Sequence, residues 1–253
     1  MGILNKIKKS SLYLKLRHLY KSKVDKDELI RRIRLYKKFC KEGDLIFDVG
    51  ANIGNRVEIF LALKTRVVAV EPQSFCRKVL RARFGDKIKI INKGLGEKEE
   101  IKTMYISTSS SQISSFSKEW IDSMKKERFS AENWDRQEQI ELTTLENLIS
   151  QFGIPSFVKI DVEGFEVNVL GGLLTAVPSL SFEYAVPDEI GRVRACLEKL
   201  NHISANYKYN YSIGESMTLE LKEYYDFEHF KTVINNANFW ETSFGDIYAK
   251  NSN

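Results

Sequence analysis

Histidine and cysteine are scarce in this sequence, and long apolar runs are missing. The three cysteines, Cys40, Cys76 and Cys196, include no CxxC pair. This spacing argues against a disulfide framework and a structural zinc site, and it favours a reducing compartment. No apolar stretch approaches the ~18 residues of a membrane span, and lysines interrupt every candidate signal peptide. We therefore expect a soluble, cytoplasmic protein.

The overall composition excludes further classes. Apolar residues make up 43% of the 253 residues, so the chain can bury most of its apolar surface in one large domain. Because this composition is close to the globular average, disordered and collagen-like proteins are excluded.

Positive charge is concentrated near the N-terminus. Residues 1–43 contain 14 Lys and Arg against 4 acidic residues, whereas acidic residues are in excess over 44–253. We predict a basic helical arm over 1–43 and one domain over 44–253. The arm could pack on the domain or on a second subunit of a homo-oligomer, or lie on the cytoplasmic face of a membrane. A nucleic-acid partner is not expected, because no basic patch with interleaved aromatic residues follows.

The domain alternates short apolar runs with helical patterns, which is typical of a parallel sheet covered on both faces. We therefore predict an α/β fold with a Rossmann-like sheet. Strands are expected at 45–49, 66–70, 87–91, 101–106, 157–162 and 180–186. Helices are expected at 24–40, 56–64, 74–84 and 118–136, and one more helix after each of the last two strands, ending at 174 and 200. Residues 107–117 hold seven serines and are expected to form a loop, either a linker or a lid.

The turn after the first expected strand reads DVGANIG and contains Asp48, Gly50, Asn52 and Gly54. Glycines let the backbone bend sharply beside a ligand, and the amides that start the next helix attract an anion. Asp48 would attract an ammonium group instead. The turn therefore suits a zwitterion such as the methionine part of S-adenosylmethionine (SAM), although a purely structural turn would have the same form.

Two polar residues end the next strands. Glu71 follows Gly50 by 21 residues, at the position where an acidic side chain accepts hydrogen bonds from ribose hydroxyls. Asn92 closes the third strand, where it could meet an adenine edge. Alternatively, Glu71 is a surface glutamate at a strand end, and Asn92 is an asparagine that forms a turn.

Several motifs together resemble the FkbM family of methyltransferases. They are DVGANIG at 48–54, VEP at 70–72, 92–96, LTTL at 142–145, KIDVEGFE at 159–166, VLGG at 169–172, and Phe182-Glu183. The resemblance covers residues 44 to 184. It implies a class I SAM-dependent fold, with a seven-stranded sheet that has one antiparallel strand, and O-methylation of a sugar or another small-metabolite hydroxyl. Tyr184 and Ala185 stand where the family often has a histidine, which puts a histidine base in doubt. Residues 107–136 match no family pattern, and we expect this insertion to shape the acceptor pocket.

The KIDVEG motif contains the candidate catalytic groups. Asp161 and Glu163 are two residues apart at the end of a buried strand, so they share a face if the strand continues. Two close carboxylates raise one pKa, which makes one of them a suitable base. We predict Asp161 or Glu163 as base or acceptor anchor, with Lys159 as an electrostatic helper, and we assign no metal.

Other roles for the carboxylates at this motif stay open. Glu163 could instead cap the following helix, or it could join Asp161 and Glu183 in holding a divalent cation. Glu166 is expected to form a salt bridge. As a whole, the sequence predicts a SAM-dependent O-methyltransferase acting on a sugar, glycan or glycosylated metabolite. A lipid or polypeptide acceptor, or a non-catalytic scaffold with the same fold, is the alternative.

Overall fold

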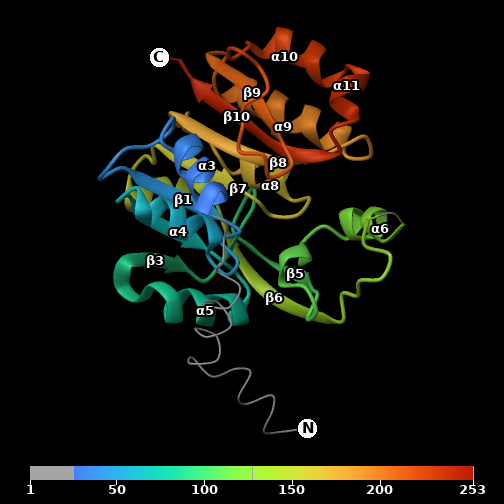
Figure 1. Cartoon of the computed structure of the whole chain (residues 1–253). Helices are drawn as coiled ribbons and strands as arrows, with labels where there is room; N and C mark the ends of the chain where they lie inside the picture. The colour runs from blue at the N-terminus through green and yellow to red at the C-terminus, as the bar shows by residue number, and fades with distance from the viewer. Residues whose placement is uncertain (1–25, 127, 253) are drawn as a thin grey trace, which may run out of the picture.

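The computed structural model describes residues 26–126 and 128–252. Its centre is a seven-stranded sheet (Figure 1). In spatial order the strands are β3 (Ile88–Ile91), β2 (Arg66–Val70), β1 (Leu45–Val49), β7 (Phe157–Ile160), β8 (Ser179–Ala185), β10 (Phe244–Asn251) and β9 (Tyr207–Ile213). β10 runs antiparallel to both of its neighbours, and the other strand pairs of this sheet are parallel among the described residues. This is the class I methyltransferase sheet that the resemblance implied, so the predicted fold is confirmed.

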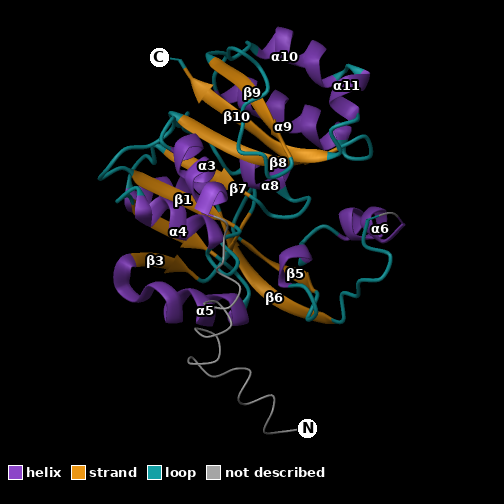
Figure 2. Ribbon diagram, in the orientation of Figure 1, coloured by secondary structure: helices purple, strands orange, loops and turns teal. Residues whose placement is uncertain are grey.

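Helices cover both faces of the sheet (Figure 2). One face packs against α3 (Lys26–Tyr36), α4 (Asn55–Ala62) and α5 (Ser74–Phe84). The other packs against α7 (Leu145–Phe152), α8 (Glu166–Gly171), α9 (Ile190–Ile203), α10 (Phe227–Ile234) and α11 (Ala237–Trp240). Alternate strand residues supply the two cores: Ile46 and Val67 pack toward α4, whereas Phe47 and Val68 pack toward α7. Burial on both faces explains why these strands read as continuous apolar runs.

A second, three-stranded sheet stands beside the main one (Figure 1). It contains β4 (Gly94–Leu95), β6 (Arg136–Thr143) and β5 (Glu100–Ile106), in that spatial order. The chain between β5 and β6 includes the 3₁₀ helix η2 (Ser111–Ile113) and α6 (Lys118–Lys126). The helix predicted over 118–136 was therefore too long, because the chain turns after Lys126 to pair as β6 with β5. Trp120 and Ile113 form a small apolar core of their own here.

Part of the predicted basic arm packs on the domain. Tyr36 at the end of α3 is fully buried, and its ring lies 4.8 Å from that of Phe60 in α4. Phe39 stacks on Tyr248 of β10 at 5.2 Å. Residues 1–25 of the predicted arm lie outside the described residues, so its contact with a membrane or a second subunit stays a prediction.

Among the described residues, no helix is both long enough and apolar enough to cross a bilayer.

Gly50 provides a sharp test of this packing. Its φ is +83°, and a Cβ there would lie 1.8 Å from the backbone oxygen of Asp161. We predict that Gly50→Ala lowers the free energy of unfolding by about 3 kcal/mol or more, through the clash and the backbone strain. The matched control is Gly43→Ala, where φ is +85° but no atom lies within 4 Å, so the loss should be about 1 kcal/mol. Urea unfolding of the two variants measures both values, and equal losses would contradict the prediction.

Candidate active site

A cavity of about 350 Å³ opens at the carboxyl ends of β1, β2, β7 and β8. Ligands of wound parallel sheets bind at this edge, where the strand order reverses. The strand ends supply its polar wall, which includes Asp48, Glu71, Asp161, Glu163 and Glu183. The smaller sheet and the loop after β5 supply the opposite wall, with Leu95, Met104, Ser111, Ser114 and Phe116.

The turn after β1 lies against this cavity. The amides of Gly50 and Ala51 both donate to the carbonyl oxygen of Val70, at 3.0 and 3.1 Å, which fixes the bend. Gly50 and Asn52 line the cavity, and Asn52 also has a positive φ of 47°. Gly54 does not line it. A Cβ at Gly54 would lie 2.4 Å from the ring of Phe84, so this glycine lets α4 pack closely on α5.

Asp48 is the buried acid of this turn. Its side chain is 2% exposed, and Oδ2 has no hydrogen-bond partner among the described residues. Burial raises the pKa of Asp48 to about 7, the positive charge of Lys159 opposes this, and Asp161 adds to it. A buried carboxylate without a donor is unfavourable unless a ligand supplies one. Asp48 is therefore placed to receive a cationic group.

Glu71 is the second buried acid. Its two carboxylate oxygens accept hydrogen bonds from the amides of Asn52 (2.8 Å) and Gln73 (2.7 Å). Burial raises the pKa of Glu71 to about 7, although these two bonds lower it. The two amides fix the carboxylate at the cavity wall, and each oxygen keeps a lone pair for a further donor.

The serine-rich loop closes over this wall, and sequence analysis did not identify its contacts. The side-chain amide of Gln73 donates to the carbonyl oxygen of Ser111 at 3.0 Å, and the Ser114 hydroxyl donates to Gln73 at 3.1 Å. The Ser111 hydroxyl also bonds to Asn52 at 3.3 Å. The predicted loop thus contributes to the site. The high serine content of the sequence predicted this loop, whereas no motif in the sequence pointed to its partner Gln73.

Asn92 is not brought to the cavity. It is exposed and lines a separate open hollow with Lys93, Glu141 and Asn147. The chain bends after β3 to form β4, so that Gly94 and Leu95 reach the cavity instead.

Lys159 lies behind the site rather than in it. Its side chain is 1% exposed, and its Nζ lies 2.8 Å from Asp246 and 3.4 Å from Asp161. Burial lowers the pKa of Lys159, but Asp161 and Asp246 together raise it well above its ordinary value. Ser181 is the neighbour of Lys159 on β8, and its small side chain leaves room for the ammonium group to reach β10. Asp246 was missed because no motif surrounds it.

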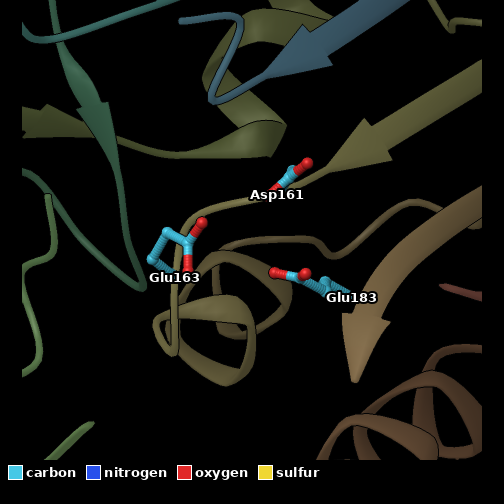
Figure 3. A group of neighbouring side chains, drawn as sticks. All are labelled: Asp161, Glu163 and Glu183. Carbon is cyan, nitrogen blue, oxygen red and sulfur yellow. The ribbon is translucent and has the colours of Figure 1, made fainter. Parts of the chain in front are cut away.

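Three carboxylates meet at the mouth of the cavity. One oxygen of each of Asp161, Glu163 and Glu183 lies within 4.8 Å of the others. Figure 3 shows the three side chains converging from the end of β7, the following loop and the end of β8. Because Ile160 pairs with Phe182, the next residues lie side by side, Asp161 just after β7 and Glu183 within β8. Burial, followed by the neighbouring carboxylates, raises the pKa of both Glu163 and Glu183 well above the ordinary value.

Glu166, not Glu163, caps the loop that carries this group. Its carboxylate accepts the amides of Val162 and Gly164, each at 3.2 Å, and no described cation pairs with it. The predicted salt bridge at Glu166 is therefore wrong, because the bends at Glu163 (φ 53°) and Gly164 (φ 85°) turn those amides toward it. The cap leaves the Glu163 side chain free to face the cavity.

The fold and the cavity define a class I methyltransferase, and comparison with known proteins identifies the family. The model of the FkbM methyltransferase domain matches residues 48–213, so this chain belongs to the FkbM methyltransferase family. It is a SAM-dependent methyltransferase, and its cofactor is SAM. The predicted family, enzyme class and cofactor are therefore confirmed. A comparison with curated proteins gave no match.

Solved structures were compared as well. A TehB-like SAM-dependent methyltransferase from Corynebacterium glutamicum has 9% identity and a TM-score of 0.46, with 96% of this chain and 98% of that one covered. Precorrin-6y C5,15-methyltransferase from Geobacter metallireducens has 11% identity and a TM-score of 0.43, with 87% and 88% covered. The plantazolicin methyltransferase BpumL, in complex with S-adenosylhomocysteine (SAH), has 12% identity and a TM-score of 0.43, with 100% of both chains covered.

The two buried acids predict a pH-dependent affinity for SAH. With pKa values of about 7, Asp48 and Glu71 lose their charge as the pH falls from 8 to 6. A protonated Asp48 no longer attracts the ammonium group, so affinity should fall by about tenfold or more over this range. Calorimetry of SAH binding at several pH values measures this, and Asp48→Asn should bind more weakly with a shallower dependence. An affinity that is constant between pH 6 and 8 would contradict the prediction.

Proposed function

We propose that this chain transfers a methyl group from SAM to a hydroxyl of a sugar, glycan or glycosylated metabolite. The observation that carries the proposal is the convergence of Asp161, Glu163 and Glu183 at the mouth of the cavity. A hydroxyl acceptor has to lose its proton during transfer, and carboxylates with a raised pKa are suitable groups to assist this near neutral pH.

The cavity residues divide between the parts of the cofactor. Asp48 receives the ammonium group, since its buried Oδ2 has no hydrogen-bond partner in the part of the chain that the structure describes. The turn at Gly50 and Asn52, which lines the cavity, receives the methionine part. Glu71 accepts the ribose hydroxyls, and Leu95 and Met104 offer an apolar wall to the adenine ring. Gly54 and Asn92 have no direct contact in this proposal.

The chain's own residues orient the reaction. When bound, SAM supplies a sulfonium-activated methyl group. Asp161 and Glu163 hold the acceptor hydroxyl in line with that group and accept hydrogen bonds from it, an orientation effect that lowers the barrier. Lys159 acts through Asp161: paired also with Asp246, its ammonium group holds the Asp161 carboxylate in place.

The acceptor enters beside the loop over 107–117. Ser111, Gln112 and Ser114 bring hydrogen-bonding groups to the cavity, and Phe116 adds an apolar ring face. Hydroxyl-rich ligands with one apolar face, such as sugars, match this combination. Among the described residues nothing favours a lipid acceptor, whose sequence support lies in the arm before residue 26. A cytoplasmic location and a homo-oligomer also stay predictions.

The role of Glu71 predicts a loss of cofactor affinity on substitution. Glu71→Gln should weaken SAH binding by about tenfold, or ~1.4 kcal/mol, because one charged acceptor is lost. The matched control is Glu241→Gln, at an exposed position after α11. Calorimetry separates the two, and an unchanged affinity in Glu71→Gln would remove the assignment to ribose.

The acceptor class is tested in cells. Mass spectrometry of surface and secreted glycans from strains with and without the gene should show glycans that are heavier by one CH₂ only when the gene is present. The gene with Asp161→Asn should restore little of this signal. Identical glycan spectra in all strains would contradict a glycan acceptor.

A further inference from the structure

The three carboxylates at the cavity mouth have few partners of their own. Asp161 shares the ammonium group of Lys159 with Asp246. For Glu163 and Glu183, no side-chain hydrogen bond or ion pair is formed with any other described residue. Three carboxylates this close repel one another strongly unless they take up protons or positive charge lies between them. The protein part of the site described here therefore lacks counter-charge.

The buried carboxylate of Asp48 independently points to a cationic ligand. It pairs in register with Lys159, so Asp48 and Asp161 extend from the same face of neighbouring strands β1 and β7. Only 2% of Asp48 is exposed, and it lines the same cavity. Its Oδ2 has no hydrogen-bond partner among the described residues. One ammonium group from the cofactor serves Asp48 and leaves the three carboxylates without a cation.

The other cations at the cavity are already paired. Arg56 contacts Glu215 at 2.7 Å, and Arg32 contacts both Glu215 and Glu28. These groups lie on α3, α4 and the loop after β9, and Glu215 pairs with both guanidinium groups. Acidic groups therefore remain in excess at the end of the cavity where β7 and β8 terminate.

The spacing and chemistry of the group fit a hard divalent cation. Mg²⁺ and Mn²⁺ prefer carboxylate oxygens at about 2.0–2.2 Å, so two ligands of one ion lie at most about 4–4.5 Å apart. The three oxygens lie within 4.8 Å of one another, which is close to this span. The group contains no nitrogen or sulfur donor, which disfavours zinc.

We propose that Asp161, Glu163 and Glu183 bind a divalent cation, Mg²⁺ or Mn²⁺, which holds the acceptor hydroxyl beside the methyl group. This rests on the proposed function. Three carboxylates leave open coordination positions for the acceptor oxygen, and coordination lowers the pKa of that hydroxyl. Its proton passes to solvent, the new O–C bond forms as the C–S bond of SAM breaks, and SAH leaves. An acceptor with two neighbouring oxygens would bind best, because it can occupy two positions.

Binding of Mn²⁺ to the full-length protein tests the site directly. After treatment with EDTA and its removal, calorimetry should show one Mn²⁺ site, and Glu183→Gln and Glu163→Gln should each weaken it at least tenfold. Asp188→Asn is the matched control, since Asp188 is an exposed acid in the loop after β8. Circular dichroism shows whether each variant is folded. If one of the two glutamate variants does not fold, the other one tests the site. No Mn²⁺ binding, or binding that both glutamate variants retain, would overturn the proposal.

Thermal melting adds a readout that distinguishes a metal site from a structural cluster. Without metal, Glu183→Gln should melt at or above the temperature of the wild type, because it removes a carboxyl group whose charged form burial and the neighbouring carboxylates disfavour. With Mn²⁺, the wild type should be stabilised and the variant should not. A variant that melts lower under both conditions to the same extent would contradict a metal site.

SAH binding measured in EDTA keeps the two proposals apart. SAH that binds while Mn²⁺ does not would remove the cation and leave the methyltransferase function intact. If Mn²⁺ binds as expected but the glycans are the same in strains with and without the gene, the proposed acceptor fails while the metal site stands.

Discussion

Burial of carboxylates at the carboxyl edge of the sheet is the constraint on which the rest of the site depends. Asp48, Glu71, Asp161, Glu163 and Glu183 line one cavity, and its opposite wall combines apolar side chains with the polar groups of Ser111, Gln112 and Ser114. Asp48 and Glu71 are buried, and the other three are partly buried and crowded together. Acids in such places are unfavourable unless they are bonded or paired, so each must be served by the backbone, by a cation or by a ligand. Glu71 is served by two amides, and Asp161 is served by Lys159. Asp48, Glu163 and Glu183 depend on what enters the cavity.

Strand register produces this arrangement. The pairing of β1 with β7 sets Asp48 beside Lys159, and the pairing of β7 with β8 carries Asp161 to the side of Glu183. The close approach of Gly50 to the backbone of Asp161 then joins the cofactor turn to the catalytic end of the cavity. Since both halves of the site share these backbones, a small shift of one strand changes cofactor binding and chemistry together.

The sequence predicted the parts of this structure that depend on local signals. Apolar runs located the strands and the DVGANIG turn, and the order of motifs placed Asp48, Glu71 and Asp161 at one edge. Asp246 could not be found, because it reaches Lys159 only through the non-local pairing of β10 between β8 and β9. Asn92 and Glu166 were misjudged for a related reason: their environment depends on bends of one or two residues, at β4 and at Glu163, that composition does not encode.

We infer that the acids of this cavity bind the positively charged groups of SAM and lie beside the acceptor. The most direct measurement is a crystal structure of the full chain with SAH. The account predicts the amino group beside Asp48, the ribose on Glu71, and the sulfur directed toward Asp161, Glu163 and Glu183. A nucleoside bound with its ribose away from Glu71, or a sulfur directed away from the three carboxylates, would contradict it.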